Sequence, residues 1–173
     1  MKLSRLRVPL GYLVGALVVL LARPRVATLA AGMALAVAGE AIRIWASGHI
    51  EKTERLATGG PYAFTRNPLY VGSALMALGV AIASASVLVV IAVAAYFAIL
   101  YPPVIREESA FLAARFPGVY AAWAQDVPAF LPRLRPGGPR ESRFDWSRVR
   151  KNREWRTAAA LPVVGALLSW RLL

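Results

Sequence analysis

The fold is decided by residues 69–104, LYVGSALMALGVAIASASVLVVIAVAAYFAILYPPV, a run of 36 residues without a charged side chain. A single membrane-spanning helix needs about 20 apolar residues, so this run is too long for one ordinary span. Gly79 and the small residues Ser84-Ala85-Ser86 lie near its middle and favour a turn there. The run therefore predicts a tight hairpin of two helices, with Pro102 and Pro103 closing or kinking the second.

Three further apolar blocks accompany the hairpin, at residues 8–22, 26–47 and 157–173. The last block is either a fifth span or a helix lying in the interface. Hydrophobic residues make up 58% of the 173-residue chain and charged residues 17%, a balance that is typical of membrane proteins. We expect an all-α, polytopic transmembrane helical bundle of four to five spans, built as a single membrane domain.

Within that domain, residues 1–47 are predicted to form an N-terminal helix pair. Residues 48–135 form the core that contains the hairpin. Residues 136–173 form a basic tail followed by the last membrane helix.

The distribution of Lys and Arg predicts the orientation in the membrane. With the N-terminus in the cytoplasm, all but four of the 21 Lys and Arg residues fall on the inner side. The exceptions are Arg23, Arg25 and Arg171 on the outer side and Arg43 within a span. Topology and anionic inner-leaflet lipids then account for most of the net charge of +12. We expect a multi-pass integral membrane protein, in the inner (cytoplasmic) membrane if it is prokaryotic, with its active site facing the cytoplasm.

The composition also excludes several kinds of site. The chain has no cysteine and one histidine, which excludes disulfides, thiolate catalysis, cysteine-ligated metals and multi-histidine metal centres. No metal is predicted. The basic segment 133–156 carries interleaved aromatic residues, which suits nucleic acid or a membrane interface. Because predicted spans bracket it, membrane lipids are the predicted partner and nucleic acid is not.

Two polar stretches, residues 48–68 and 106–135, flank the mouth of the hairpin. A hairpin returns the chain to the face it left, so we expect these stretches to meet. Pro68 can begin the third helix with Asn67 as its N-cap. The free N–H groups at that end, together with Arg66, can receive a carboxylate or phosphate. The alternative is a capped helix start at which Arg66 contacts lipid phosphate.

The second stretch opens with Arg106, Glu107 and Glu108. One carboxylate is predicted to face inward and hold a cation or hydroxyls; the alternative is solvation at the interface and pairing along the helix. A short amphipathic helix containing Phe111 follows, and Pro117-Gly118 is expected to end it before a second short helix.

Glu40 and Arg43 lie three residues apart within the second apolar block and can pair on one helix face. Ionisable residues at membrane depth are candidates for function, although snorkelling is an equally good explanation near the helix end. His49 lies at the exit of the same helix and is a capping residue or a ligand contact.

The order of these pieces resembles a known superfamily. GGPYAFTRNPLYVGS (59–73), the hairpin, REE (106–108) and FPGVYAAWAQDVPAFLPRL (116–134) are similar to the isoprenylcysteine carboxyl methyltransferase and phospholipid methyltransferase superfamily of membrane enzymes. The resemblance covers about residues 46–134. The eukaryotic isoprenylcysteine enzymes have histidine where this chain has Asn67, which can hydrogen-bond but cannot act as a base. The departure bears on the isoprenylcysteine substrate more than on the methyl donor.

The resemblance implies S-adenosylmethionine as cofactor and a lipophilic acceptor: a prenyl-cysteine-like carboxylate, a phospholipid amine or another lipid. Arg106, which would orient an acceptor carboxylate or phosphate, and Glu107 are the predicted catalytic residues. The predicted substrate-binding residues are Glu40, Arg43 and Trp123. The predicted cofactor contacts are His49, Leu56, Ala57, Thr58, Tyr62, Arg66, Asn67, Pro68, Leu69, Tyr70 and Glu108.

Two other functions fit the sequence. One is an NADPH-dependent membrane reductase of steroid-reductase-like architecture, which shares a similar core. The other is a non-catalytic membrane subunit in which the two polar stretches form a docking surface. Titration with S-adenosylmethionine and with NADPH separates the three, since the subunit would bind neither.

Overall fold

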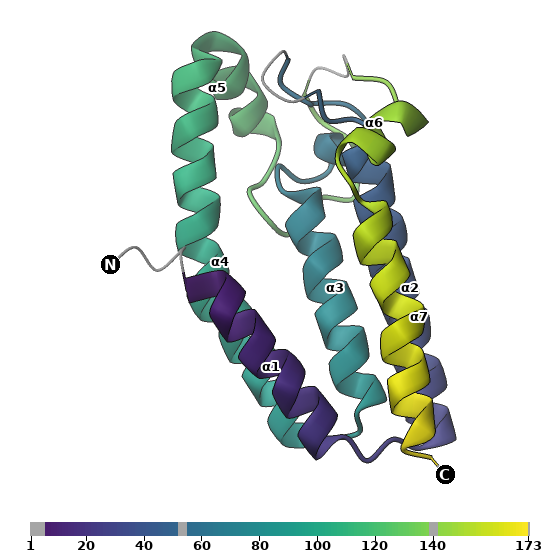
Figure 1. The fold of residues 1–173 in the computed structure, drawn as a ribbon. Coiled ribbons are helices and arrows are strands. Elements are labelled where there is room, and N and C mark those ends of the chain that lie inside the picture. The colour runs from purple at the N-terminus through teal and green to yellow at the C-terminus, as the bar shows by residue number, and fades with distance from the viewer. Residues whose placement is uncertain (1–5, 52–54, 139–141, 173) are drawn as a thin grey trace. The chain divides into compact units, whose positions relative to one another are not determined.

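The computed structural model describes residues 6–51, 55–138 and 142–172. Lys2, Arg5, Lys52 and Arg140, which were counted on the inner side, and Leu173, the end of the last apolar block, lie outside the described residues. The described elements are all helical, as predicted (Figure 1). In chain order they are α1 (Arg7–Leu21), α2 (Val26–Ser47), the 3-10 helix η2 (Gly60–Ala63), α3 (Pro68–Ala83), α4 (Val87–Arg115), α5 (Pro117–Asp126), α6 (Trp146–Lys151) and α7 (Trp155–Trp170).

The predicted hairpin is confirmed. The uncharged run forms α3 and α4, and the turn between them falls at residues 84–86. Ser84 stabilises this turn, because its hydroxyl donates to the Ala81 carbonyl (2.7 Å) and accepts from the Ser86 N–H (3.3 Å). Ala85 has a φ of +52°, which places the reversal of the chain at that residue.

The second hairpin helix does not end at the prolines. Pro102 and Pro103 lie inside α4, which continues to Arg115. Phe111 therefore belongs to α4, and the prediction of a separate short helix there is wrong. A proline inside a helix costs about 3 kcal/mol, but the following sequence REESAFLAAR consists mostly of strong helix formers. The predicted boundary at Pro117 is confirmed, since α5 begins there.

Two helices, α2 with 22 residues and α4 with 29, are long and apolar enough to cross a bilayer. The apolar helices α1 and α3 are shorter. Large apolar side chains on these helices point outward; Tyr12 on α1 is 77% exposed and Val87 on α4 is 74% exposed. Apolar surface on this scale suits a lipid environment and is unfavourable in water.

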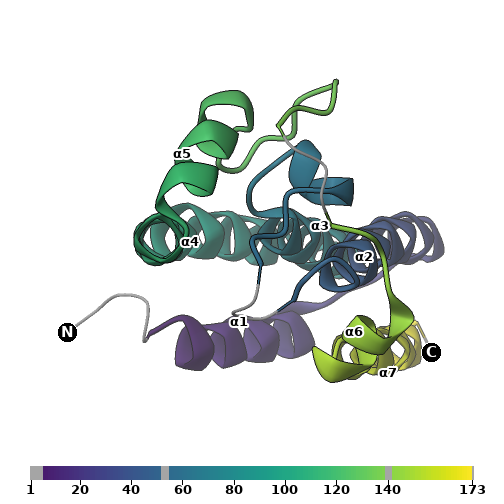
Figure 2. The ribbon, with the colours of Figure 1, turned by 90° about the horizontal axis from the view of Figure 1, so that it is seen from above.

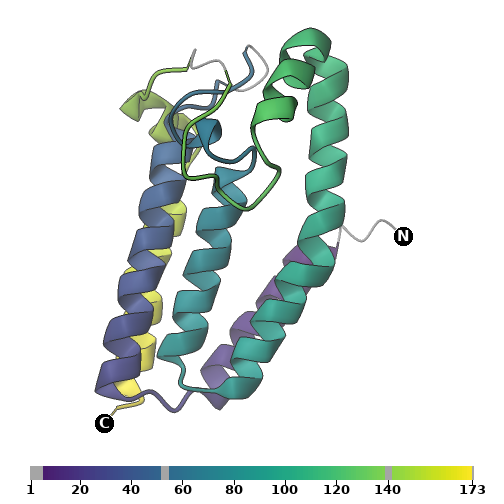
Figure 3. The same cartoon turned by 180° about the vertical axis from the view of Figure 1, so that it is seen from behind.

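The chain divides into two compact units. The first, which we call the apolar unit, comprises Met1–Glu40, Ser73–Val104 and Thr157–Leu173. In it α2 and α3 approach through glycines: a Cβ on Gly32 would lie 2.4 Å from the Ala83 nitrogen, and one on Gly79 would lie 2.5 Å from the Gly32 carbonyl oxygen. Figure 3 shows α7 running beside α2, and α4 contacts α1 where the Tyr96 hydroxyl donates to the Arg7 carbonyl (2.9 Å).

The second unit, the polar unit, comprises Ala41–Gly72 and Ile105–Arg156. Its core contains Tyr62, Tyr120 and Trp123 with smaller apolar side chains. The irregular segment after α5 is hydrogen-bonded to η2 and to the chain that follows it. The Arg66 N–H donates to the Pro128 carbonyl (2.9 Å), and the Gly137 N–H donates to the Ala63 carbonyl (2.8 Å). Within this unit η2 contacts α5, and the end of α2 lies between η2 and α6 in the view of Figure 2.

Candidate functional site

The two polar stretches meet inside the polar unit, as predicted. The Trp123 indole nitrogen donates to the Tyr62 carbonyl (3.0 Å), which joins α5 to η2. The Tyr70 hydroxyl donates to Glu108 Oε2 (2.7 Å), which joins the start of α3 to α4. These two bonds connect parts of the sequence that lie about 40 to 60 residues apart.

At the start of α3, the backbone and the side chain of Asn67 bond to different parts of the chain. The helix begins at Pro68, as predicted, and the Asn67 carbonyl accepts from the Tyr70 and Val71 N–H groups (3.0 and 3.1 Å). The side-chain Nδ2 donates instead to the Ala129 carbonyl (2.7 Å). This amide therefore ties the start of the helix to the segment that follows α5.

Part of the Arg66 guanidinium is engaged by Tyr120. Its Nη1 donates to the Tyr120 hydroxyl (2.8 Å), and its guanidinium carbon lies 5.7 Å from the centre of that ring. Its buried Nε has no hydrogen-bond partner among the described residues. A buried donor without a partner is costly, so this nitrogen marks a place where an acceptor would be stabilising.

His49 packs against the turn that precedes Tyr62. Gly60 has a φ of +56°, and a Cβ there would lie 2.4 Å from the imidazole, so both conformation and space require glycine. The Nδ1 atom lies 2.9 Å from the Trp45 carbonyl oxygen. Because a carbonyl only accepts, Nδ1 carries the proton in this bond. In the neutral ring Nε2 is then the acceptor.

Tyr62 is buried and its hydroxyl keeps its proton. Burial raises the pKa of the phenol well above its usual range, and the Glu108 carboxylate raises it further. A phenol of this kind donates a hydrogen bond to a ligand and does not serve as a base near neutral pH.

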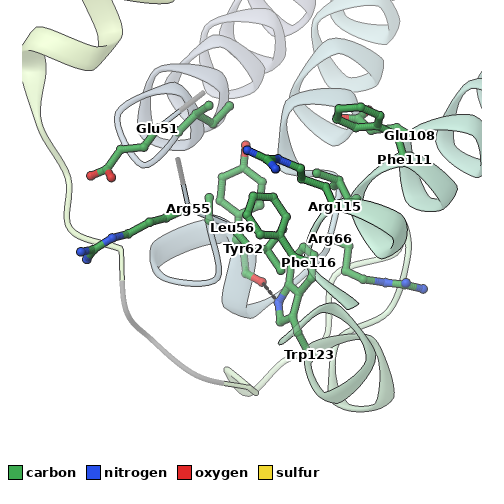
Figure 4. Close-up of a pocket in the computed structure, with 13 residues that line it drawn as sticks. Glu51, Arg55, Leu56, Tyr62, Arg66, Glu108, Phe111, Arg115, Phe116 and Trp123 are labelled. Atoms are coloured by element: carbon green, nitrogen blue, oxygen red, sulfur yellow. Dashed lines mark hydrogen bonds between the residues drawn. The ribbon is translucent and has the colours of Figure 1, made fainter. Parts of the chain in front are cut away.

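Four of these residues, Tyr62, Arg66, Glu108 and Trp123, line a pocket of about 150 Å³ in the polar unit (Figure 4). Its lining residues are Ile50, Glu51, Arg55, Leu56, Ala57, Tyr62, Arg66, Glu108, Phe111, Leu112, Arg115, Phe116 and Trp123. Part of the lining is aromatic or aliphatic, and the rest contains both acidic and basic side chains. A second, smaller cavity of about 30 Å³ is lined by His49 and Ser142, and it shares four lining residues with the first: Glu51, Arg55, Leu56 and Ala57.

The charged side chains point in different directions. In Figure 4 the Arg115 guanidinium reaches toward the end of the Tyr62 ring, whereas the Arg66 guanidinium points away from it. The Glu51 carboxylate also points away from Tyr62. Arg115 is therefore the cation best placed for a ligand that sits over Tyr62.

Helix geometry explains which residues of α4 reach the pocket. Glu108, Phe111, Leu112 and Arg115 line it, and their spacing of three, four and seven residues puts them on one face. The predicted catalytic residues at positions 106 and 107 are exposed and do not line the pocket. At 100° per residue Arg106 lies on the far side of the helix, and Glu107 lies at the edge of the lining face, four residues before Phe111.

The remaining predicted residues described here do not line this pocket. Thr58 and Pro68 are buried, and Thr58 Oγ1 has no hydrogen-bond partner among the described residues. The Leu69 carbonyl accepts from Arg43 Nη1 at 3.4 Å. Glu40 is buried and belongs to the stretch of α2 assigned to the apolar unit.

Several residues at the site were missed in the sequence. Glu51, Arg55 and Arg115 line the pocket, as do the apolar residues of the same face of α4. For Arg115 a signal existed, because it lies seven residues after Glu108 on a helix. No such signal pointed to Glu51, because it lies in a loop, where residue spacing does not show which side chains share a face.

The lining fits the predicted cofactor by its chemistry. S-adenosylmethionine carries a carboxylate, an ammonium, a sulfonium, ribose hydroxyls and an adenine. Arg115 or Arg66 suits the carboxylate, Glu108 suits the ammonium or ribose, and the rings of Phe111 and Phe116 suit the adenine. The volume is below the roughly 300–1,000 Å³ of pockets that enclose a whole drug-sized ligand, so the pocket matches one end of such a molecule.

Comparisons with known proteins show which family and which proteins the chain is similar to. The phospholipid methyltransferase family model matches residues 14–118. The chain is 43% identical over 105 residues to the cobalt-zinc-cadmium resistance protein CzcN of Cupriavidus metallidurans, and 36% identical over 105 residues to the nickel-cobalt-cadmium resistance protein NccN of Alcaligenes xylosoxydans. Each match covers 60% of this chain and 47% of the relative, so the chain spans about half the length of these relatives.

No solved structure matches the chain. The family match contains the hairpin, the loop with η2, and α4 with the pocket-lining face; it ends before α6 and α7. Since it covers more than half of the residues, the chain belongs to the phospholipid methyltransferase family.

Proposed function

We propose that this chain is an integral membrane methyltransferase that uses S-adenosylmethionine to methylate a lipophilic acceptor at the cytoplasmic membrane face. The observation that carries the proposal is the pocket beside Tyr62. It combines a carboxylate fixed by Tyr70, arginines and an aromatic lining within the region that the family model matches.

The chain's residues would divide the work as follows. Arg115 binds an anionic group, and Glu108, held by the Tyr70 hydroxyl, binds a cationic one. The protonated Tyr62 phenol donates a hydrogen bond, and the neighbouring rings exclude water. Orienting two bound reactants in this way can lower a barrier by about 7–11 kcal/mol.

The bound cofactor supplies a methyl group already activated by positive sulfur. An acceptor held in line with that methyl group would take it with a lone pair, and the carbon–sulfur bond would break with its electron pair left on sulfur. Among the described residues that line the pocket, none is well suited to act as a general base. A carboxylate or thiolate acceptor needs none, whereas an amine must arrive deprotonated or pass its proton to water.

The membrane arrangement is part of the proposal. Four to five spans, with the N-terminus inside, put the polar stretches at the cytoplasmic face, where most of the Lys and Arg residues gather. The exposed apolar side chains of the helices support entry of the acceptor from the bilayer. Arg106, Glu107, Glu40 and Arg43 keep their predicted roles toward the acceptor.

The test is binding and transfer by the full-length chain in lipid nanodiscs. S-adenosylmethionine should bind saturably, NADPH should not, and a methyl-labelled cofactor should pass its label to a lipid extract. Binding of NADPH alone would make the chain a reductase. Binding of neither would leave a non-catalytic subunit.

A further inference from the structure

The segment 142–154, which we call the tail segment, lies outside the region matched by the family model. It includes α6 and ends just before α7. Its outward face is basic and exposed, but Arg148, Val149, Asn152 and Glu154 turn inward. The question is what these inward residues hold.

The tail segment caps the C-terminal end of α2. The last carbonyls of a helix have no partner within it. The Asn152 Nδ2 donates to the Ser47 carbonyl at 2.9 Å and lies 3.4 Å from that of Ile50. The Asp145 N–H donates to the Gly48 carbonyl at 3.0 Å. Residues about 100 positions later thus satisfy the carbonyls of the loop that leads into the pocket.

Two ion pairs strengthen this connection. Arg43 on α2 contacts Glu154 through Nε (2.7 Å) and Nη2 (2.6 Å), and the two side chains are only 18% and 6% exposed. Arg148 on α6 pairs with Glu51. Glu51 lines the pocket with its stem while its carboxylate points away from Tyr62 (Figure 4). Arg148 therefore holds the pocket wall from outside.

Close contacts complete the connection. The Phe144 ring packs edge-on against His49, with ring centres 5.9 Å apart, and leaves no room for a Cβ on Gly48. The Gly59 N–H donates to Ser142 Oγ (2.9 Å), and a Cβ on Gly59 would lie 2.4 Å from the Ser142 carbonyl oxygen. Both glycines therefore permit the tail segment to approach the loop.

We propose that the tail segment is a positioning element of the methyl-donor pocket. Arg148 and Asn152 fix the loop 48–51. Glu154 fixes Arg43 near the end of α2, and Ser142 fixes the turn that carries Tyr62. None of them touches the ligand; they set the geometry of the residues that do. The proposal rests on the proposed function, because the ligand whose binding they affect is S-adenosylmethionine.

The experiment compares Arg148→Ala and Asn152→Ala with a control on the same short helix, Arg150→Ala, whose side chain is exposed. Two readouts are used on the full chain in nanodiscs: the Kd for S-adenosylmethionine, and amide hydrogen exchange of residues 48–51 without ligand. Each test variant should raise the Kd by about 3- to 10-fold, the effect of one lost hydrogen bond or ion pair. Exchange in the loop should also be faster. Arg150→Ala should change neither.

A rescue separates positioning from general loss of stability. Arg148→Glu combined with Glu51→Arg reverses the pair and should restore the Kd to within about 3-fold of the wild-type value. Ser142→Ala is a milder second variant if Arg148→Ala does not fold, and it should accelerate exchange at residues 59–60.

The readouts distinguish two failures. If the wild-type chain binds no S-adenosylmethionine, the proposed function fails while the exchange data still report on the tail segment. If the wild-type chain binds it, and Arg148→Ala and Asn152→Ala match the wild type in both Kd and loop exchange, the positioning role is overturned.

Discussion

In the apolar unit the helices pack through small and apolar side chains, whereas in the polar unit the chain is held by side-chain hydrogen bonds and ion pairs. Gly32 and Gly79 let α2 and α3 approach until backbone atoms touch. By contrast, Asn67, Arg66 and Trp123 each donate to a partner more than 50 residues away. Close packing of small residues suits a bilayer, where helices associate through van der Waals contact. The polar unit has groups with which a water-soluble ligand can interact.

The largest effect is expected from breaking the buried ion pair of the polar unit. Glu154→Gln removes the carboxylate opposite Arg43 and leaves a cation that is mostly buried. Loss of one partner of a buried pair costs about 3 kcal/mol or more in the free energy of unfolding. Thermal unfolding in detergent should show the loss, while Asp126→Asn, at an exposed carboxylate, should unfold like the wild type. Equal Tm values for the two variants would contradict the importance of the pair.

A smaller loss is expected from overpacking in the apolar unit. In Gly32→Ala the added Cβ meets backbone atoms of α3 that cannot rotate away, so the unfolding free energy should fall by about 1–3 kcal/mol. The control is Gly15→Ala, where nothing lies within 4 Å of the new Cβ and a slight gain from helix propensity is expected. If Gly32→Ala were as stable as Gly15→Ala, the close approach of α2 and α3 would be wrong.

A change in ligand binding with little change in stability is expected from Tyr70→Phe. The substitution removes the hydroxyl that donates to Glu108 Oε2, and the ring remains in place. The Kd for S-adenosylmethionine should rise by about 3- to 10-fold, as for loss of a hydrogen bond to a charged group. Calorimetric titration measures the Kd. An unchanged value would separate Glu108 from the ligand or Tyr70 from Glu108.

The smallest effect concerns alkaline pH. Burial raises the pKa of Tyr62 above its unfolded value of about 10, so the folded state holds its proton more tightly. Its contribution to stability is therefore fully present below pH 10 and is lost as the pH rises further. The Tm of the wild type should fall more steeply above pH 10 than that of Tyr62→Phe. Parallel curves would show that the phenol is not desolvated.

The helices could be predicted from the sequence because apolar runs and their interruptions are local properties. The uncharged run gave α3 and α4, the small residues at 84–86 gave the turn, and α2 matches the predicted block at 26–47. The sequence left open whether the helix ends or kinks at Pro102 and Pro103, and α4 continues through them to Arg115. Backbone propensity favours ending a helix at two prolines, but the helix-forming residues after them extend α4.

The site was predictable only where one element carries it. The loop with Tyr62 and the acidic pair near the end of a predicted span could be recognised in the sequence. The resemblance to a family then predicted a functional role for them. The pairs Arg43–Glu154 and Arg148–Glu51 join residues about 100 positions apart, and no spacing rule reaches that far. The tail segment was therefore seen only as a basic stretch, although its inward side chains hold the pocket loop.

The most direct measurement of the central claim is calorimetric titration of the full chain in nanodiscs with S-adenosylmethionine, for the wild type, Glu108→Gln and Asp126→Asn. The account predicts saturable binding by the wild type, a Kd raised by about 10-fold in Glu108→Gln, and an unchanged Kd in Asp126→Asn, since only the first carboxylate faces the pocket. No binding by the wild type, or equal Kd values for the wild type and Glu108→Gln, would contradict it.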